Sequence, residues 1–241
     1  MATVVDVAAN IAKVRAQMQE ACEQAGRGAD EVTLMLAAKY QPVENLIAAI
    51  RAGERVFGHN IIQQLEEAEE GLTDFQHFTT VIGHVQSNKL STAMRYAQRI
   101  DTVDALRTAE QINRRQIARI ESGESSDQPY PILLQVNSSG ASTQFGCEPT
   151  DLLPLAEQIL ELSHVRIDGL MTIGANTDDE SAIIRSFEVT RELSAKMREL
   201  PTLSEAKTIS MGMTHDLELA IAHGSTEIRI GTAIFGPRPT K

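Results

Sequence analysis

Short apolar runs alternate with amphipathic segments along nearly the whole chain. The run VTLMLAAK is apolar up to its terminal lysine except at Thr33, a pattern typical of a strand that is buried on both faces of a parallel sheet. Ahead of this run, apolar residues recur at helical spacing from Ile11 to Cys22 and predict an amphipathic opening helix. The same change between continuous runs and helical spacing repeats towards the end of the chain.

Eight segments have the character of buried strands, and helical patterns lie between them. These segments are 32–39, 55–57, 77–82, 100–103, 132–136, 165–171, 208–211 and 227–230. Such alternation is typical of α/β folds, and eight strands favour a closed (β/α)8 barrel, the TIM barrel, over an open sheet. The extra N-terminal helix can supply the eighth helical position. We therefore expect residues 1–241 to form one barrel domain of the usual size.

Net charge and the two ends of the chain restrict the partners, the cellular location and the further domains that we expect for this barrel. A formal net charge of -11 disfavours the broad cationic surface that nucleic-acid binding needs. The amino terminus lacks a basic stretch followed by an apolar one, and no run approaches the ~20 apolar residues that span a bilayer. We therefore expect a cytoplasmic protein that does not bind membranes. Only the tail GTAIFGPRPTK follows the last strand, so we expect no C-terminal β domain.

Neither the cysteines nor the histidines form a recognisable metal motif. Cys22 and Cys147 lie far apart in the sequence, and two cysteines make neither a disulfide framework nor a zinc site. The six histidines lack the spacing of known metal-ligand motifs. We expect no metal in this protein, and we expect both cysteines to be packing residues.

Lys39 is the first candidate for chemistry, because barrel active sites lie at the carboxyl ends of the strands. This lysine closes the first predicted strand. A lysine in that place is partly desolvated, which favours the free amine that can attack an aldehyde. On position alone, a surface lysine whose alkyl stem covers a strand end is the more common case.

Small residues and hydroxyls gather near the ends of the last two predicted strands. Ser210 and Gly212 lie in the segment ISMGMTHD, and Gly231 and Thr232 lie in RIGTAIFG. Barrels most often bind phosphate at this point, and small residues let backbone N–H groups approach an anion. Neither segment has the spacing of a P-loop or a dinucleotide fingerprint, so each could equally be an ordinary glycine turn. Together with Lys39, they predict a site for a phosphorylated aldehyde at the barrel mouth.

A longer set of motifs points to a known family. In chain order the motifs are LMLAAKYQPVENLIAAIRAGERVFGHN, IGHVQSNK, DTVDALRTA, IDGLMTIGAN and SMGMTHDLELAIAHGSTEIRIGTAIFG. Together they resemble the pyridoxal phosphate homeostasis proteins of the YggS/PROSC type, from about Val32 to Gly236. That family is similar to the barrel domain of alanine racemase. The resemblance implies a barrel of fold-type III that holds pyridoxal 5'-phosphate (PLP) as a Schiff base on Lys39.

The resemblance also implies roles for residues around that lysine. Asn60 matches an asparagine near the cofactor ring, and Ser210, Gly231 and Thr232 match the phosphate contacts. Arg229 matches the arginine that faces the pyridine nitrogen in racemase-like barrels. Because arginine keeps its proton at ordinary pH, the ring nitrogen would stay neutral and PLP would be a poor electron sink.

Two residues, His59 and Gln144, depart from the family pattern. The family usually has glutamate where His59 stands and lysine where Gln144 stands; the second change removes a cation from a loop at the barrel mouth. His84 matches a family motif and is expected to line the pocket. Without the motif, Arg229 would be read as the partner of a core acid such as Asp101.

Two classes of function fit this pattern, and a third class fits only part of it. The resemblance implies a PLP carrier that is not an enzyme, acts in PLP homeostasis and supplies apo PLP-dependent enzymes. The alternative is a PLP-dependent enzyme similar to amino-acid racemases, which need an acid and a base on opposite faces of the substrate carbon. Related racemases take one of these groups from the C-terminal β domain of a partner subunit, so its expected absence also favours a monomer. A Schiff-base aldolase acting on a sugar phosphate shares the lysine and the phosphate site but not the motifs.

Overall fold

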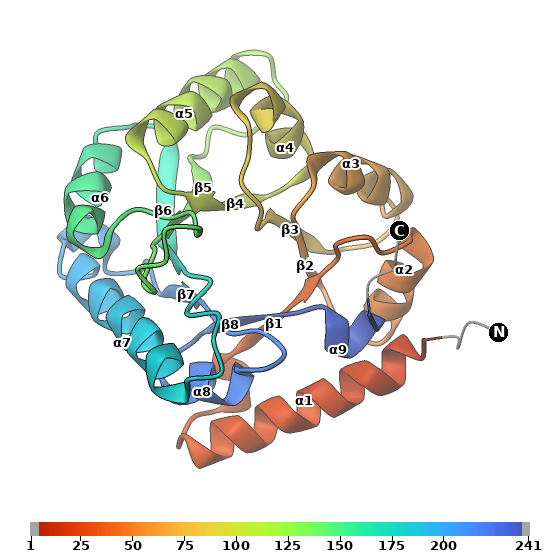
Figure 1. The fold of residues 1–241 in the computed structure, drawn as a ribbon. Coiled ribbons are helices and arrows are strands. Elements are labelled where there is room, and N and C mark those ends of the chain that lie inside the picture. Colours follow the sequence, from red (N-terminus) through yellow and green to blue (C-terminus); the bar gives the residue numbers. More distant parts are fainter. Residues whose placement is uncertain (1–4, 238–241) are drawn as a thin grey trace.

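Eight parallel strands close into a barrel in the order in which they occur along the chain. The computed structural model describes residues 5–237, and β8 pairs with β1 to complete the ring (Figure 1). The fold class predicted from the sequence is confirmed, and every strand lies within two residues of its predicted bounds. The strands are β1 Thr33–Ala37, β2 Val56–His59, β3 Phe78–Val81, β4 Arg99–Val103, β5 Tyr130–Gln135, β6 Val165–Met171, β7 Thr208–Ser210 and β8 Glu227–Ile230.

Helices surround the barrel, and the opening helix packs between α2 and α8 and against α9, in one apolar cluster with β1 and β8, as expected of the eighth helical position (Figure 1). The amide of Asn10 fixes this contact by donating a hydrogen bond of 2.9 Å to the carbonyl oxygen of Ile234. The helices are α1 Val7–Gln24, α2 Val43–Arg51, α3 Ile62–Gly71, α4 Leu90–Tyr96, α5 Leu106–Glu121, α6 Leu152–Leu160, α7 Glu180–Met197, α8 Leu217–Ala222 and α9 Thr232–Phe235. Short 3-10 helices span Ala29–Glu31, Ser87–Lys89, Pro149–Asp151 and Pro201–Leu203.

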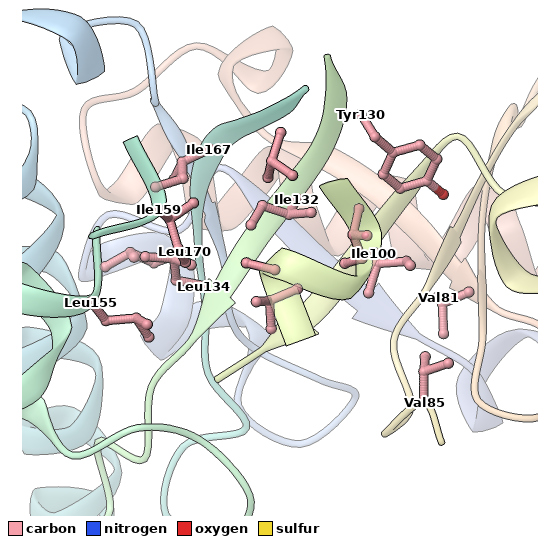
Figure 2. Close-up of a cluster of buried hydrophobic side chains, with 14 of the residues drawn as sticks. Val81, Val85, Ile100, Tyr130, Ile132, Leu134, Leu155, Ile159, Ile167 and Leu170 are labelled. Atoms are coloured by element: carbon pink, nitrogen blue, oxygen red, sulfur yellow. The ribbon is translucent and has the colours of Figure 1, made fainter. Parts of the chain in front are cut away.

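The core lies mainly between the barrel and the helices, because the strands are covered on both faces. All five residues of β4 are buried, as continuous runs in parallel sheets are expected to be. Figure 2 shows part of the larger cluster, to which Ile100 and Ile132 of the barrel and Leu155 and Ile159 of α6 all belong. A second cluster joins α1 and α2 to β1, β2 and β8. This packing fixes the strand ends from which the functional residues project.

A buried ion-pair network crosses the barrel at its amino-terminal end. Arg99, the first residue of β4, donates to Asp101 at 2.6 Å and to Glu227, the first residue of β8, at 2.8 Å. The hydroxyl of Thr80 donates a further hydrogen bond of 2.6 Å to Asp101. Burial opposes the positive charge, but the two carboxylates raise the pKa of the Arg99 guanidinium above its ordinary value.

Candidate functional site

A cavity of about 420 Å³ opens at the carboxyl-terminal end of the barrel. Its volume lies in the range usual for small-molecule and cofactor sites, and this end is where barrel enzymes place their active sites. Its walls come from both ends of the chain and from the middle. They consist of Ala37, Lys39, Gln41, Asn60, Ile82, Met171, Ile173, Met213, Thr214, His215, Arg229, Gly231, Thr232 and Gly236.

Lys39 stands where the strand pattern predicted, just beyond the last residue of β1. Ala37 and Lys39 both line the cavity, because alternate residues of a strand point to the same side. The Ala38 N–H between them donates to the Gly58 carbonyl of β2 at 2.9 Å. Lys39 as a whole residue is half-buried.

Arg229 forms part of the cavity wall from β8. Its side chain donates to Ser210 Oγ at 3.0 Å and to the Thr172 carbonyl oxygen at 2.7 Å, both neutral acceptors. Burial lowers the pKa of this guanidinium, while the carboxylate of Glu227 acts most strongly in the opposite direction. The sequence left open a pairing with Asp101, but that acid is bonded to Arg99 instead. Arg229 therefore has no carboxylate in direct contact among the described ion pairs.

Gly231 and Thr232 line the cavity at the turn that follows β8. A Cβ added at Gly231 would stand 3.2 Å from the Ala37 carbonyl oxygen, closer than most real contacts. The absence of a side chain thus lets this turn approach β1, which carries Lys39. The phosphate half and the amine half of the predicted site are brought to one cavity.

Two other residues expected at the phosphate lie behind the cavity wall. Ser210 is fully buried and supports Arg229 through its hydroxyl. Gly212 has a φ of +94°, and any side chain there would collide with Ala220 of α8. Neither is a lining residue. The chain instead reaches the cavity slightly later, at Thr214 and its neighbours.

Asn60 lines the cavity from the end of β2, but its predicted neighbour His84 does not. The Asn60 amide makes a long hydrogen bond of 3.5 Å to the Ile82 carbonyl oxygen. His84 is exposed and stacks on the ring of Phe145, with centroids 4.5 Å apart. The imidazole therefore belongs to the rim of the barrel mouth.

The two departures from the family pattern occupy different surroundings. His59 is buried on the outer side of β2, and both of its ring nitrogens lack a partner among the described residues. Desolvation is the main effect that lowers its pKa to about 4. Gln144 ties the loop after β5 to the loop after β6, donating to the Gly174 carbonyl oxygen at 2.9 Å. Its other amide atom accepts from the Ser139 hydroxyl at 2.9 Å.

Sequence reasoning missed Thr214, His215 and Gln41 as cavity residues. The first two belong to the segment ISMGMTHD, in which the sequence indicated Ser210 and Gly212 instead. Their hydroxyl and imidazole were the available signal. Gln41 follows Lys39 by two residues and carried no signal of its own.

Within residues 5–237, no three side chains of His, Cys, Asp or Glu gather as a metal-binding group. In the same residues, no helix is both long and apolar enough to cross a bilayer.

Comparison with known proteins first defines the class to which this barrel and cavity belong. The sequence profile of the alanine racemase N-terminal domain matches residues 8–239. An alanine racemase from Clostridium difficile superposes with a TM-score of 0.75 over 100% of this chain and 61% of the racemase, at 12% identity. That likeness shows the fold alone.

Closer relatives then define the family. The pyridoxal phosphate homeostasis protein of Escherichia coli K12 is 36% identical over 97% of both chains, and that of Pseudomonas aeruginosa is 37% identical over 96% of both. PipY of Synechococcus elongatus, solved with PLP bound, superposes with a TM-score of 0.82 at 30% identity. The match covers 96% of this chain and 100% of PipY. The chain belongs to the family of pyridoxal phosphate homeostasis proteins, as its motifs had indicated.

Proposed function

We propose that this protein binds PLP in the cavity at the barrel mouth and carries it as a Schiff base on Lys39. The observation that carries the proposal is the meeting of Lys39, Arg229, Gly231 and Thr232 in one cavity of about 420 Å³. The names of the relatives and the PLP bound in PipY support the same cofactor. The proposal includes a monomer that acts in the cytoplasm, takes part in PLP homeostasis and supplies apo PLP-dependent enzymes.

The cavity walls fit the chemistry of this cofactor. PLP supplies an aldehyde that bonds reversibly to primary amines, together with an anionic phosphate. Lys39 offers the amine, and the Thr232 and Thr214 hydroxyls offer donors to an anion on the side of the last two strands. The close approach of Gly231 to β1 keeps these two groups within one small site. Asn60 would lie beside the ring.

Arg229 would meet the ring nitrogen and leave it without a proton. A guanidinium donates hydrogen bonds but does not readily release a proton, even where burial lowers its pKa. Ser210 and the Thr172 carbonyl orient it from behind. An unprotonated ring withdraws electrons weakly, so this arrangement favours holding the cofactor over carbanion chemistry. Ser210 thus acts on the cofactor through Arg229, and Gly212 acts by letting the chain turn.

The alternative of a racemase-like enzyme is tested at His215. Apart from Lys39 and Arg229, this imidazole is the one basic side chain among the residues that line the cavity, and racemisation needs two groups. We expect no α-proton exchange when the PLP-loaded protein is incubated with alanine or serine in deuterated buffer. Exchange that occurs in the parent protein and disappears in His215→Asn would show that the protein is an enzyme and would contradict the proposal of a carrier.

The central test of the proposal is chemical trapping. Protein mixed with PLP should absorb in the near ultraviolet or visible, and borohydride reduction should fix the cofactor on Lys39 in mass spectra. Lys39→Ala should lose the adduct, while some non-covalent binding through the phosphate groups remains. Lys207→Ala is the matched control, because Lys207 pairs with Glu205 and lies near the opposite end of the barrel. An adduct that survives in Lys39→Ala would refute the assignment.

A further inference from the structure

The turn that carries Lys39 has an unusual backbone conformation. The Gln41 N–H donates to the Ala38 carbonyl oxygen at 3.1 Å, so Lys39 and Tyr40 are the central residues of a four-residue turn. Tyr40 has a φ of 61°, and it is the one non-glycine residue with positive φ among residues 5–237. Turns with positive φ at the third position favour glycine, since a side chain there is strained. A bulky tyrosine therefore occupies a position that glycine would fill without this strain.

The strained residue is held from α3 rather than by packing of its ring. The Tyr40 N–H donates to Gln64 Oε1 at 3.0 Å, which fixes the direction of the peptide that follows Lys39. Tyr40 as a whole residue is 41% exposed. Hydrophobic burial thus gives only a partial reason for a tyrosine here, and strain kept at a site is a reason to look for a function.

The ring of Tyr40 contacts the amine proposed to bind the cofactor. Lys39 Nζ lies 5.3 Å from the ring centroid, within the distance at which an ammonium group is attracted to an aromatic face. Lys39 lines the cavity, whereas Tyr40 is not a lining residue. The ring therefore stands beside the cavity, within cation–π distance of Lys39 Nζ.

We propose that Tyr40 is a positioning residue that stabilises the free form of Lys39 and so limits how firmly the cofactor is retained. The inference rests on the proposed function. To bond to an aldehyde, Lys39 Nζ gives up a proton, its lone pair forms the C=N bond and one water molecule leaves. Hydrolysis adds that water back, and the released Nζ regains a proton and returns to the ring. A contact made in only one of two states shifts the equilibrium towards that state, here towards release.

Two variants separate the ring from the phenol hydroxyl. Tyr40→Leu removes the aromatic face, and Tyr40→Phe keeps it as the matched control. In cofactor-free protein, the rate at which a mild acylating reagent labels Lys39 is measured by mass spectrometry, with Lys207 of the same molecule as internal standard. We expect Tyr40→Leu to label Lys39 about two- to fivefold faster, the factor that an exposed cation–π contact supplies. Tyr40→Phe should match the parent protein.

Titration with PLP provides the second readout. Tyr40→Leu should shift the equilibrium between free and covalently bound Lys39 by about the same two- to fivefold towards the bound form. Labelling and retention that are unchanged in Tyr40→Leu would overturn the inference, as would a Tyr40→Phe variant that behaves like Tyr40→Leu. If Tyr40→Leu does not fold, Tyr40→Asn removes the ring with a residue that tolerates positive φ. Failure of the parent protein to form any adduct would refute the proposed function, while the labelling experiment would still test Tyr40.

Discussion

Two buried arginines in one barrel have opposite surroundings. Arg99 at the amino-terminal end is bonded to the carboxylates of Asp101 and Glu227, and their charges raise the pKa of its guanidinium. Arg229 at the carboxyl-terminal end donates to a hydroxyl and a carbonyl, and burial lowers its pKa. Both arginines border a cavity, but the charge of the first is matched by two carboxylates, whereas the second has no carboxylate in direct contact among the described ion pairs. Only the second is suited to meet a ligand.

Two neighbouring histidines repeat the contrast on the outer side of the barrel. His77 Nε2 lies 2.9 Å from Glu69 Oε2, and this hydrogen bond is the main effect that raises the His77 pKa. His59 has no such partner in the described part of the chain, and burial lowers its pKa to about 4. The carboxylate partner thus favours the charged form of the half-buried His77, whereas the buried His59 has no such partner and favours the neutral form.

The largest effect is expected when the matched arginine is removed. Arg99→Leu leaves Asp101 and Glu227 buried without a cation, so the free energy of unfolding should fall by about 3–5 kcal/mol. Arg229→Leu removes hydrogen bonds to neutral acceptors and should cost about 1–3 kcal/mol of stability, while PLP binding should weaken. Denaturant titration and PLP titration of both variants measure the two effects. Equal losses of stability would contradict the contrast between the two sites.

The next largest effect concerns pH and the unpartnered histidine. The folded-state pKa of His59 is depressed from 6.5 to about 4, so the unfolded chain takes up the proton first as the pH falls. Its effect is absent above pH 6.5, and by pH 4.5 it should cost about 2–3 kcal/mol of stability. His77 acts in the opposite direction: its raised pKa adds stability below pH 6.5 that is lost as the pH rises through the folded-state value.

A single substitution isolates the contribution of His59. His59→Leu keeps a buried side chain of similar size and removes the group that titrates, so its unfolding free energy should fall less between pH 7 and pH 4.5. Chemical denaturation of both proteins at the two pH values provides the comparison. Parallel pH profiles would show that the imidazole is solvated or paired in solution.

The smallest of these effects is expected at the phosphate side of the cavity. Thr232→Val removes one hydroxyl donor and should weaken PLP affinity by roughly 1–3 kcal/mol. Thr33→Val, an exposed position at the amino-terminal end of β1, is the matched control and should leave affinity unchanged. Calorimetric titration distinguishes the two. An unchanged affinity in Thr232→Val would mean that the phosphate lies elsewhere.

The barrel could be predicted because parallel strands covered on both faces leave a clear apolar signature. Lys39 followed from the same pattern, since the residue closing a strand reaches the barrel mouth. Ser210 and Gly212 lie behind the cavity wall rather than on it, and the sequence could not show this because it does not reveal how far a loop rises beyond its strand. Thr214, two residues later, lines the cavity instead.

Other features of the site depend on partners that a linear pattern does not reveal. The positive φ of Tyr40 arises from a turn held by Gln64, a residue of α3 that is distant in sequence. The isolation of His59 depends on which groups face it from neighbouring elements. Composition and spacing carry no information about either.

A crystal structure of the protein soaked with PLP tests the central claim most directly. We expect electron density continuous from Lys39 Nζ to the ligand, with the phosphate near Gly231 and Thr232 and the ring nitrogen facing Arg229. Density for PLP at any other place, or joined to a different lysine, would contradict the account.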